Sequence, residues 1–424
     1  MNEKFFTSVK LDADLCKGCI NCIKRCPTQA IRVRNGKAEI TKEFCIDCGE
    51  CIRICPHHAK LPSYDKLEVL KDYEYTVALP APALYGQFNN LDDVNIVLTA
   101  LKRVGFDDVY EVSGAAELVS ELSREYVHNH PELHPIISTA CPTVTRLIRV
   151  KFPNLLEHLL PVKPPMEIAA ALARKRAIEK TGLKSEDIGI FFISPCPAKV
   201  TSVRSPLGYE KSDVDGVLAM KNIYPELINK MSVVAEKDEL EDLIISGKIG
   251  ISWGSSDGES SGLLIDSYLA ADGIENVMKV LEELEDQKIS GLKFIELNAC
   301  PGGCVGGVLT VENPYVAKSK LKKLRRYMPV TANHMEIDEK DMYFDSEIEY
   351  EPVYTFGSNV VDNISKMMHV EELCKKFPGL DCGSCGAPSC KALAEDIVRG
   401  QAKEKDCIHV LRQFINRFSD EINS

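Results

Sequence analysis

The middle of the chain carries apolar residues at spacings that predict helices and strands in alternation. Apolar residues at helical spacing predict helices at 90–104, 114–128, 165–180, 263–272 and 274–285. Short continuous apolar runs predict strands at 76–84, 135–138, 188–193, 249–252 and 292–297. Because strands and helices take turns, we expect an α/β domain with mixed, largely parallel twisted sheets flanked by helices.

Two smaller regions flank this domain. Near the N-terminus, the sequence of Ala30–Ile40 predicts a β-hairpin whose turn is Asn35-Gly36. We expect this region to form a small α+β domain. Near the C-terminus we predict a helix from Lys391 and an amphipathic helix from Cys407 to Phe418, and we expect the second to pack on its own domain. The predicted divisions are 1–65, 70–330, an acidic connecting segment at 331–369, and a small helical module at 370–424.

Composition narrows the class of protein. Of 424 residues, 45% are hydrophobic and 27% charged, which is ordinary for a globular chain. The net charge of −12 argues against nucleic acid as a partner, and no apolar run is long enough to span a membrane. Met1–Lys10 lacks the apolar segment of an export signal. We therefore expect a cytoplasmic protein whose 17 cysteines are reduced, most of them as metal ligands, rather than joined in disulfides.

The N-terminal cysteines form a doubled run. The pattern Cys-x2-Cys-x2-Cys-x3-Cys-Pro occurs twice, and it is the two-cluster ferredoxin run, in which the fourth cysteine of each run binds the other cluster. Zinc is a poor alternative, because it favours two separated Cys-x2-Cys pairs. The predicted ligands are Cys16, Cys19, Cys22 and Cys55 for one [4Fe–4S] cluster, and Cys45, Cys48, Cys51 and Cys26 for the other.

Three further cysteines follow predicted strands and precede proline. They are Cys141, Cys196 and Cys300, and Cys304 follows the last of them after Pro-Gly-Gly. A lone cysteine at a strand end is usually a small buried apolar residue. Ligands gather at the carboxyl ends of strands in α/β sheets, however, and four thiolates suit one [4Fe–4S] cluster.

A last set of cysteines lies in the C-terminal module. Cys382, Cys385, Cys390 and Cys407 supply four thiolates from a tight loop and from beyond a helix. This set suits zinc as well as a [4Fe–4S] cluster. Cys374 fits no ligand set, and we expect it to be structural.

Residues 139–314 resemble the catalytic domain of [FeFe]-hydrogenases. Three signatures carry the resemblance: Thr139-Ala-Cys-Pro142, Pro195-Cys-Pro-Ala-Lys199 and Glu296-Leu-Asn-Ala-Cys-Pro-Gly-Gly-Cys304. With the ferredoxin run and Ala81-Pro82-Ala83, the resemblance covers about residues 10–315. It implies a catalytic domain that holds its cofactor between two lobes. It also implies an H-cluster, in which Cys304 bridges the [4Fe–4S] cluster of these four cysteines to a diiron unit with CO, cyanide and azadithiolate ligands.

The resemblance also implies roles for other residues. Lys199 matches a lysine that hydrogen-bonds a cyanide ligand, and Pro82 and Ala83 match the strand end that packs on the dithiolate. The block from Cys382 to Cys407 is similar to the cluster-binding module of corrinoid iron–sulfur proteins, which favours a fourth [4Fe–4S] cluster over zinc.

Four positions depart from the family pattern. Fast members have a proton-relaying cysteine where this chain has Ala140, and a glutamate where it has Ser202. Ser194 and Asn298 replace two methionines, so polar groups are expected where thioethers sit near the diiron unit. These departures and the C-terminal module are similar to sensory hydrogenases without a PAS domain (group D).

The leading hypothesis is a sensory [FeFe]-hydrogenase that converts protons, electrons and H2 slowly. The alternatives are a metabolic hydrogenase with another proton route and an iron–sulfur carrier or assembly protein without a diiron unit. Expected partners are H2 and protons, a redox or signalling protein, and the proteins that mature the diiron site. A homodimer is compatible with the sequence.

Overall fold

The computed structural model describes residues 6–237, 240–332, 339–352 and 360–422 of the chain. It contains two compact units. Unit 1 comprises Met1–Ser8, Ile46–Gly49 and Ser63–Tyr350, and unit 2 comprises Val9–Cys45, Glu50–Pro62 and Glu351–Ser424. This division does not test the domain boundaries expected from the sequence, which stay predictions. Residues 333–338 and 353–359 of the predicted connecting segment lie outside the described residues.

Unit 1 is built on two sheets in which every strand pair is parallel. One sheet has the order β6-β5-β8-β9 and the other has the order β10-β11-β7. This arrangement confirms the predicted α/β class. The strands are β5 Tyr75–Pro80, β6 Asp108–Val109, β7 Ile136–Ile137, β8 Ile188–Ser194, β9 Gly216–Ala219, β10 Tyr268–Asp272 and β11 Phe294–Asn298.

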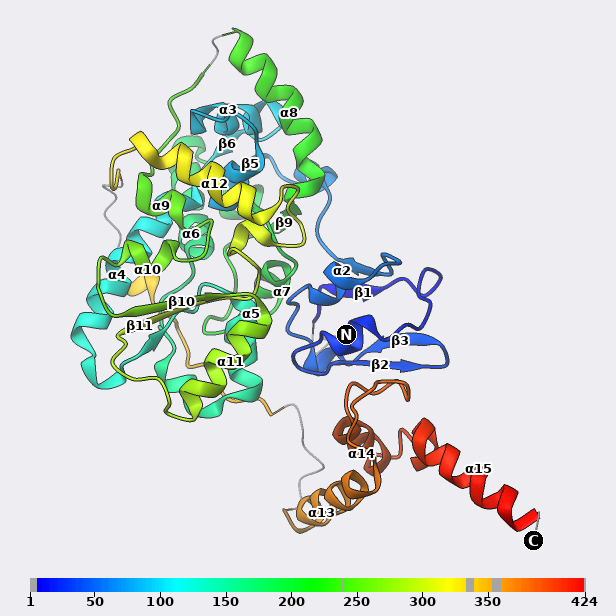
Figure 1. Ribbon diagram of the computed structural model, residues 1–424. Helices are drawn as coiled ribbons and strands as arrows, with labels where there is room; N and C mark the ends of the chain where they lie inside the picture. The colour runs from blue at the N-terminus through cyan, green and yellow to red at the C-terminus, as the bar shows by residue number, and fades with distance from the viewer. Residues whose placement is uncertain (1–5, 238–239, 333–338, 353–359, 423–424) are drawn as a thin grey trace. The chain divides into compact units, whose positions relative to one another are not determined.

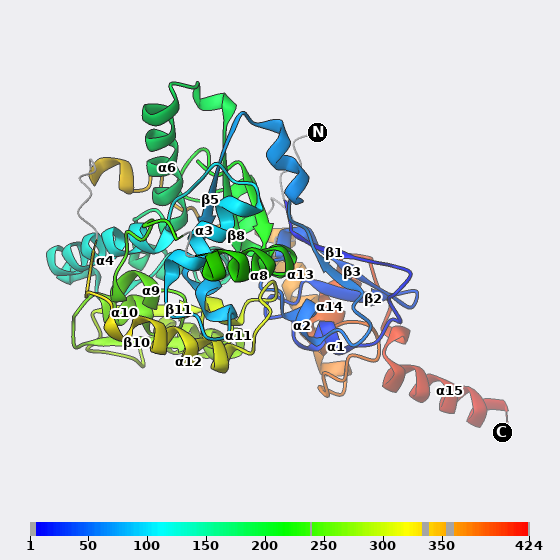
Figure 2. The same cartoon turned by 90° about the horizontal axis from the view of Figure 1, so that it is seen from above.

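Helices connect these strands and cover the sheets. Helices α3 and α8 lie side by side (Figures 1 and 2). The segment after β5 is a 3-10 helix, Pro82–Gln87, rather than the end of a longer strand. The α-helices of unit 1 are α3 Val94–Val104, α4 Val112–Asn129, α5 Pro142–Lys151, α6 Pro165–Thr181, α7 Ala198–Arg204, α8 Met220–Lys237, α9 Lys248–Ser252, α10 Gly258–Gly262, α11 Ile274–Glu285 and α12 Pro314–Leu324.

Strand β8, which lies between β5 and β9, is enclosed by the core. All seven of its residues are buried, as expected for a parallel strand with both faces covered. Phe191 lies at the centre of the larger hydrophobic cluster, where its ring contacts Tyr73 edge-on at 5.5 Å between ring centroids. The strand that carries Cys196 at its end is therefore one of the most enclosed parts of the unit.

Two further predictions of secondary structure were wrong. The run 249–252 forms helix α9 instead of a strand, because the periodicity of only four residues does not distinguish the two states. The predicted helix 263–272 instead contains strand β10, which pairs in parallel with β11. Its Leu-Ala-Ala sequence has helical propensity, and the sheet contact overrides that propensity.

Gly250 is the reason that α9 can lie directly on α4. A Cβ atom on Gly250 would lie 2.1 Å from the carbonyl oxygen of Ser113, which is on α4. The two backbones can approach this closely only because Gly250 has no side chain.

We expect Gly250→Ala to destabilise the fold by about 1–3 kcal/mol, because the added methyl group must push α9 away from α4. Chemical denaturation of the variant and the wild type measures this loss. Ser232→Ala, at an exposed position on α8, is the control and should change little. Equal stability of all three proteins would contradict the close contact.

Unit 2 contains two short antiparallel pairs and five α-helices among its described residues. The hairpin of β2 Ile31–Arg34 and β3 Lys37–Ile40 confirms the predicted Asn-Gly turn, since Gly36 has a φ of +73°. The other pair is β1 with β4. The remaining bounds are β1 Val9–Leu11, β4 Lys60–Pro62, α1 Asn21–Lys24, α2 Glu50–Ile54, α13 Val360–Lys376, α14 Cys390–Val398 and α15 Ile408–Ile422.

The last helix does not pack as expected from the sequence. Helix α15 confirms the amphipathic helix, but both views show it extending away from α14 (Figures 1 and 2). Val410 packs against the hydrophobic cluster of the C-terminal module. Five other apolar side chains of the helix are exposed: Ile408, Leu411, Phe414, Ile415 and Phe418.

Candidate metal centre

Three of the four strand-end cysteines follow strands of the two parallel sheets. Cys141 is the N-cap of α5 and lies four residues beyond β7, Cys196 lies two residues beyond β8, and Cys300 lies two residues beyond β11. Cys304 begins a 3-10 turn after Cys300. The carboxyl ends of strands from both sheets therefore carry three of these cysteines.

The electrostatics of three of these cysteines, Cys141, Cys196 and Cys304, indicate that their sulfur atoms are neighbours. Burial raises the pKa of Cys196 to about 11, and the neighbouring Cys141 contributes to the rise. Burial raises the pKa of Cys304 to about 12, with further contributions from Cys196 and Cys141. Three sulfur atoms that influence one another in this way share one buried region.

Two glycines shape the turn between Cys300 and Cys304. Gly302 and Gly303 have φ angles of +73° and +89°, a region that favours glycine. A Cβ atom on Gly303 would lie 2.2 Å from the amide nitrogen of Ser256. The turn therefore presses its backbone against the segment before α10, which brings Cys304 to the pocket.

A buried pocket adjoins these cysteines. Its lining combines apolar residues with a few convergent polar ones, which is typical of a cofactor site. The lining includes Pro82, Ala140, Cys141, Lys199, Trp253, Glu259, Glu296, Asn298 and Cys304.

Lys199 is the cation of this pocket. It is 9% exposed, and its Nζ donates a hydrogen bond to the carbonyl oxygen of Ala140 at 3.1 Å. It lies on α7, which begins directly after Cys196-Pro197, so the strand end that supplies a thiolate also supplies the ammonium group. A buried ammonium with free donor capacity suits an anionic ligand.

The four positions that depart from the family pattern have different surroundings in the structure. Ala140 and Asn298 line the pocket, and Asn298 donates to Glu296 at 2.7 Å. The hydroxyl of Ser194 instead donates to the carbonyl oxygen of Cys196 at 2.8 Å, which braces the cysteine turn. Ser202 lines a neighbouring hollow with Lys199 and Ala140. Ala83 is fully buried behind Pro82 and is not part of the pocket lining.

Glu259 is a functional candidate that the sequence analysis missed. Its Oε2 accepts a hydrogen bond from the hydroxyl of Ser138 at 2.7 Å, and Ser138 accepts one from the amide of Ala140 at 3.2 Å. Its Oε1 is buried and has no hydrogen-bond partner among the residues that the structure describes. Burial, assisted by the nearby carboxylate of Glu296, raises the pKa of Glu259 to about 8. No local signal marks this glutamate in its Gly/Ser-rich segment.

Glu296 supports that arrangement from β11. Its carboxylate accepts hydrogen bonds from the amide of Asp257 at 3.0 Å and the amide of Ser260 at 2.9 Å. These bonds fix the start of α10 and therefore the position of Glu259. Burial raises the pKa of Glu296 as well, so the two carboxyl groups together favour holding a proton.

The pocket and its cysteines fit the cofactor that the sequence implies. Four thiol ligands suit a [4Fe–4S] cluster, Lys199 suits an anionic ligand, and the unpartnered Oε1 of Glu259 leaves one polar group for a ligand. In the described part of the chain, no three His, Cys, Asp or Glu side chains are placed to hold a single metal ion. A cubane cluster does not require such a group, because each of its thiolates binds a different iron atom.

The predicted ligands of one ferredoxin-like cluster also lie together. Cys16, Cys19, Cys22 and Cys55, the four predicted ligands of one cluster, line one cavity in unit 2. Of the other predicted set, Cys26, Cys45 and Cys51 pack with the small hydrophobic cluster of that unit.

Cys48 belongs to unit 1, where it packs against the same hydrophobic cluster as Cys141. Beside it, Asp47 is 1% exposed and accepts hydrogen bonds from the amide of Ser8 at 2.9 Å and the hydroxyl of Thr201 at 2.7 Å. Thr201 is on α7, two residues after Lys199. The loop that carries Cys48 is thus bound to the helix that carries the pocket's cation.

The C-terminal cysteines gather around the small cluster of α13 and α14. Cys407 is buried there, and Cys385 and Cys390 pack against it. Burial raises the pKa of Cys385, and Cys382 and Cys407 contribute to the rise, which places these sulfur atoms near one another. Cys374, expected to be structural, is partly buried against the same cluster.

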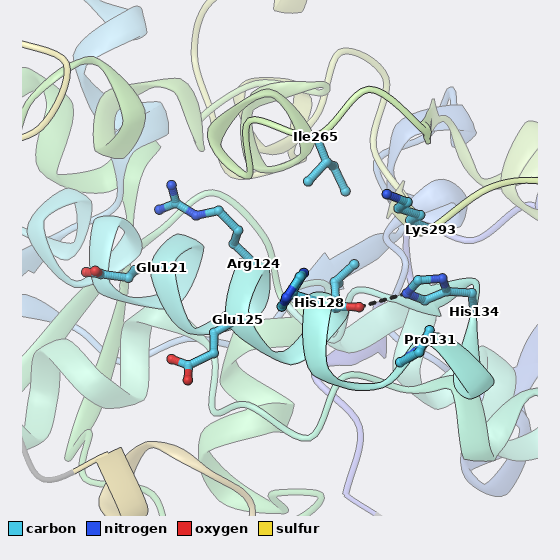
Figure 3. Close-up of a pocket in the computed structure, with 9 residues that line it drawn as sticks. Glu121, Arg124, Glu125, His128, Pro131, His134, Ile265 and Lys293 are labelled. Atoms are coloured by element: carbon cyan, nitrogen blue, oxygen red, sulfur yellow. Dashed lines mark hydrogen bonds between the residues drawn. The ribbon is translucent and has the colours of Figure 1, made fainter.

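A second hollow of unit 1 lies beside α4 and is separate from the metal centre (Figure 3). Arg124, His128, His134 and Lys293 contribute to its lining, and none of the described residues that line it is a cysteine. The carbonyl oxygen of Val127 accepts a hydrogen bond from Nε2 of His134 at 2.8 Å, which occupies that ring nitrogen.

Fold and site together define an iron–sulfur protein with an α/β cofactor domain. The chain matches the family described as iron only hydrogenase large subunit, C-terminal domain, over residues 74–258 and 255–308, and it belongs to that family. It also matches the 4Fe-4S dicluster domain over residues 8–56 and a family of Fe-S cluster segments over residues 377–409. The expected iron–sulfur character of all three regions is thereby confirmed.

Individual relatives are distant. The chain is 24% identical to iron hydrogenase 1 of Clostridium pasteurianum over 290 residues, which are 57% of this chain and 50% of that protein. It is 24% identical over 123 residues to the probable cytosolic Fe-S cluster assembly factor CG17683 of Drosophila melanogaster, 26% of each chain. A solved structure of a variant of the [FeFe]-hydrogenase HydA1 from Chlamydomonas reinhardtii aligns with a TM-score of 0.45 at 16% identity, covering 63% of this chain and 87% of that one.

The chain spans about half the length of curated hydrogenase relatives that it matches. Among the described residues, no helix has the length and apolar character needed to cross a membrane.

We expect Glu259 to make the folded protein less stable as the pH rises. The folded chain keeps a proton on Glu259 up to about pH 8, whereas the unfolded chain releases it near its ordinary pKa of about 4.3. Stability from this proton is complete below the unfolded pKa and is lost as the pH rises through about 8.

Glu259→Gln cannot titrate, so its unfolding temperature should fall less than that of the wild type between about pH 5 and pH 9. Scanning calorimetry of samples with equal iron content measures the difference. Glu226→Gln, an exposed position on α8, should behave as the wild type does. An identical fall in Glu259→Gln and the wild type would contradict the raised pKa.

Proposed function

We propose that this chain is an [FeFe]-hydrogenase that interconverts H2 with two protons and two electrons slowly and acts as a hydrogen or redox sensor. The observation that carries the proposal is one buried pocket bordered by candidate cluster cysteines and a lysine, with an alanine where fast members of the family have a cysteine. Family membership supports the hydrogenase class. The sensory role, similar to group D members without a PAS domain, rests on Ala140, Ser194, Ser202 and Asn298.

The cofactor in this proposal is an H-cluster. Cys141, Cys196, Cys300 and Cys304 would hold its [4Fe–4S] part, and Cys304 would bridge to the diiron part. When bound, a diiron unit with CO, cyanide and azadithiolate ligands supplies the metal site and the amine at which H2 is made or split. Lys199 would donate a charge-assisted hydrogen bond to a cyanide ligand, and Pro82 would pack on the dithiolate.

Protons would reach the pocket through a carboxyl group. Ala140 cannot carry a proton, but Ser138 links its amide to Glu259, whose Oε1 has no hydrogen-bond partner. A carboxyl group with a pKa of about 8 can both take and give a proton near neutral pH. Glu259 would therefore hold the proton that a cysteine at position 140 holds in fast relatives.

Electrons would reach the pocket through the other clusters. We propose three further [4Fe–4S] clusters, two in the ferredoxin-like region and one on Cys382, Cys385, Cys390 and Cys407. The proposed location is cytoplasmic. The proposed partners are a redox or signalling protein and the proteins that mature the diiron site.

Two other functions have observations in their favour. Glu259 offers a proton route, which a metabolic hydrogenase would also need. The similarity to a probable cytosolic Fe-S cluster assembly factor favours a carrier without a diiron unit. The buried Lys199 favours the hydrogenase over the carrier, because a carrier has no anionic diiron ligand for it to bind.

Infrared spectra after loading with a synthetic diiron precursor test the cofactor. We expect CO and cyanide bands in the wild type, and a shift of the cyanide bands in Lys199→Met, which lacks the donor. Lys184→Met, an exposed lysine, serves as the control. A wild type with full iron content and no such bands would leave the carrier as the function.

Glu259→Gln should lower H2 turnover by about 10²-fold or more at equal diiron occupancy, because it removes a positioned acid/base group. Glu226→Gln is the matched control and should keep the wild-type rate. Steady-state H2 assays with a one-electron dye measure both. An unchanged rate in Glu259→Gln would show that protons enter elsewhere.

Ala140→Cys should raise turnover above that of the wild type, because it adds a second group able to carry protons beside the pocket. Ala140→Ser, similar in size but less acidic, is the control. No gain at equal occupancy would mean that proton supply does not limit the rate, and the sensory interpretation would then need another basis.

A further inference from the structure

The C-terminal cysteine loop lies against the hairpin of the ferredoxin-like region in unit 2. The amide of Val33, on β2, donates a hydrogen bond to the carbonyl oxygen of Gly386 at 2.8 Å. Arg34 donates from Nη1 to the carbonyl oxygen of Cys385 at 3.0 Å. A Cβ atom on Gly386 would lie 1.9 Å from the carbonyl oxygen of Val33, so the loop approaches β2 backbone to backbone.

Asp396 fixes this contact with charge. The carboxylate, on α14, is 1% exposed and accepts two hydrogen bonds from Arg32, at 2.6 Å from Nε and at 3.1 Å from Nη2. Nη2 of Arg34 donates a third at 2.6 Å. Bidentate arginine–carboxylate bonds are strong and directional, and a buried carboxylate without its partners is costly. The three side chains therefore hold α14 at one position on β2.

The same loop also touches the segment between two ferredoxin cysteines. Nζ of Lys24 donates to the carbonyl oxygen of Pro388 at 3.5 Å. A Cβ atom on Gly383 would lie 3.1 Å from Cε of Lys24 and 3.4 Å from Cδ1 of Ile23. Ile23 and Lys24 come directly after Cys22 and precede Cys26 in the chain. The side chains of Ile23 and Lys24, next to Cys22 in the chain, thus lie against the C-terminal cysteine loop.

We propose that Arg32, Arg34 and Asp396 are positioning residues, which hold the Cys382–Cys385 loop against the Cys22–Cys26 segment. This position would let one electron pass directly between the C-terminal metal centre and a ferredoxin-like metal centre. One centre loses an electron and the other gains it, and no bond or proton changes place. A protein that donates or accepts single electrons at the C-terminal module completes the balance. The proposal rests on the iron–sulfur part of the proposed function and not on the diiron unit.

Electron paramagnetic resonance of the reduced, reconstituted full chain tests this proposal. In the wild type we expect magnetic interaction between the C-terminal centre and a ferredoxin-like centre, seen as broadened or split signals. Asp396→Asn keeps the shape of the side chain and removes its charge, so docking should weaken by about 10²–10³-fold and the interaction should disappear. Glu371→Gln, an exposed acid on α13, should leave the signals unchanged.

Hydrogen exchange gives a readout that does not depend on the metals. The Val33 amide should lose protection in Asp396→Asn and keep it in Glu371→Gln, because its partner Gly386 belongs to the docked loop. Asp396→Glu keeps the charge and should restore part of both signals.

If Asp396→Asn loses iron, the double variant Arg32→Met/Arg34→Met decides, because it leaves the C-terminal module untouched. Magnetic interaction that persists in a fully loaded variant with an unprotected Val33 would overturn the proposal, and so would its absence from the wild type. Failure of the CO and cyanide test would reject the diiron unit and leave these outcomes unaffected.

Discussion

The structure depends on holding several thiol groups in a place where water cannot solvate their charge. Burial raises the pKa values of Cys196 and Cys304 far above that of an ordinary thiol, so the protein alone favours neutral sulfur there. Bonds to the proposed iron–sulfur cluster would offset this cost, and the buried ammonium of Lys199 would reduce it further. The two parallel sheets meet the requirement geometrically, because their strand ends converge where the cysteines follow them. The glycines of the Cys300–Cys304 turn then allow the backbone to approach closely enough to complete the set.

Sequence patterns were sufficient to predict those features that residues close together in the chain determine. The spacing of the ferredoxin cysteines follows from cluster geometry, and the unbroken apolar run of β8 follows from burial on both faces. Sequence patterns failed where tertiary contacts decide whether a segment forms a helix or a strand. Residues 249–252 become helical because α4 accepts their glycine, and residues 268–272 form a strand because β11 offers an edge. Glu259 gave no signal, since its surroundings become buried only when α10 packs beside α9 and β11.

In the proposed function, the pocket keeps a group that can carry protons although Ala140 cannot. Ser138 joins the amide of Ala140 to the carboxyl of Glu259, so both residues belong to the same wall of the pocket. A carboxyl group needs burial to hold a proton at neutral pH, whereas a thiol does so in water. The Glu259–Glu296 pair supplies this condition, because each buried carboxyl group disfavours ionisation of the other. A consequence is that the ionisation of Glu259 changes near pH 8.

Two buried aspartates show how cysteine-bearing segments are held in place. Asp47, in unit 1, binds the loop of Cys48 to α7, and Asp396, in unit 2, binds α14 to β2. Each has its carboxylate satisfied by donors from distant parts of the chain. An apolar contact can slide by a small distance with little loss of energy, whereas a buried carboxylate displaced from its donors loses charge-assisted bonds without regaining water. Electron transfer between metal centres depends steeply on their separation, so contacts with one favoured geometry suit these segments better than apolar packing does.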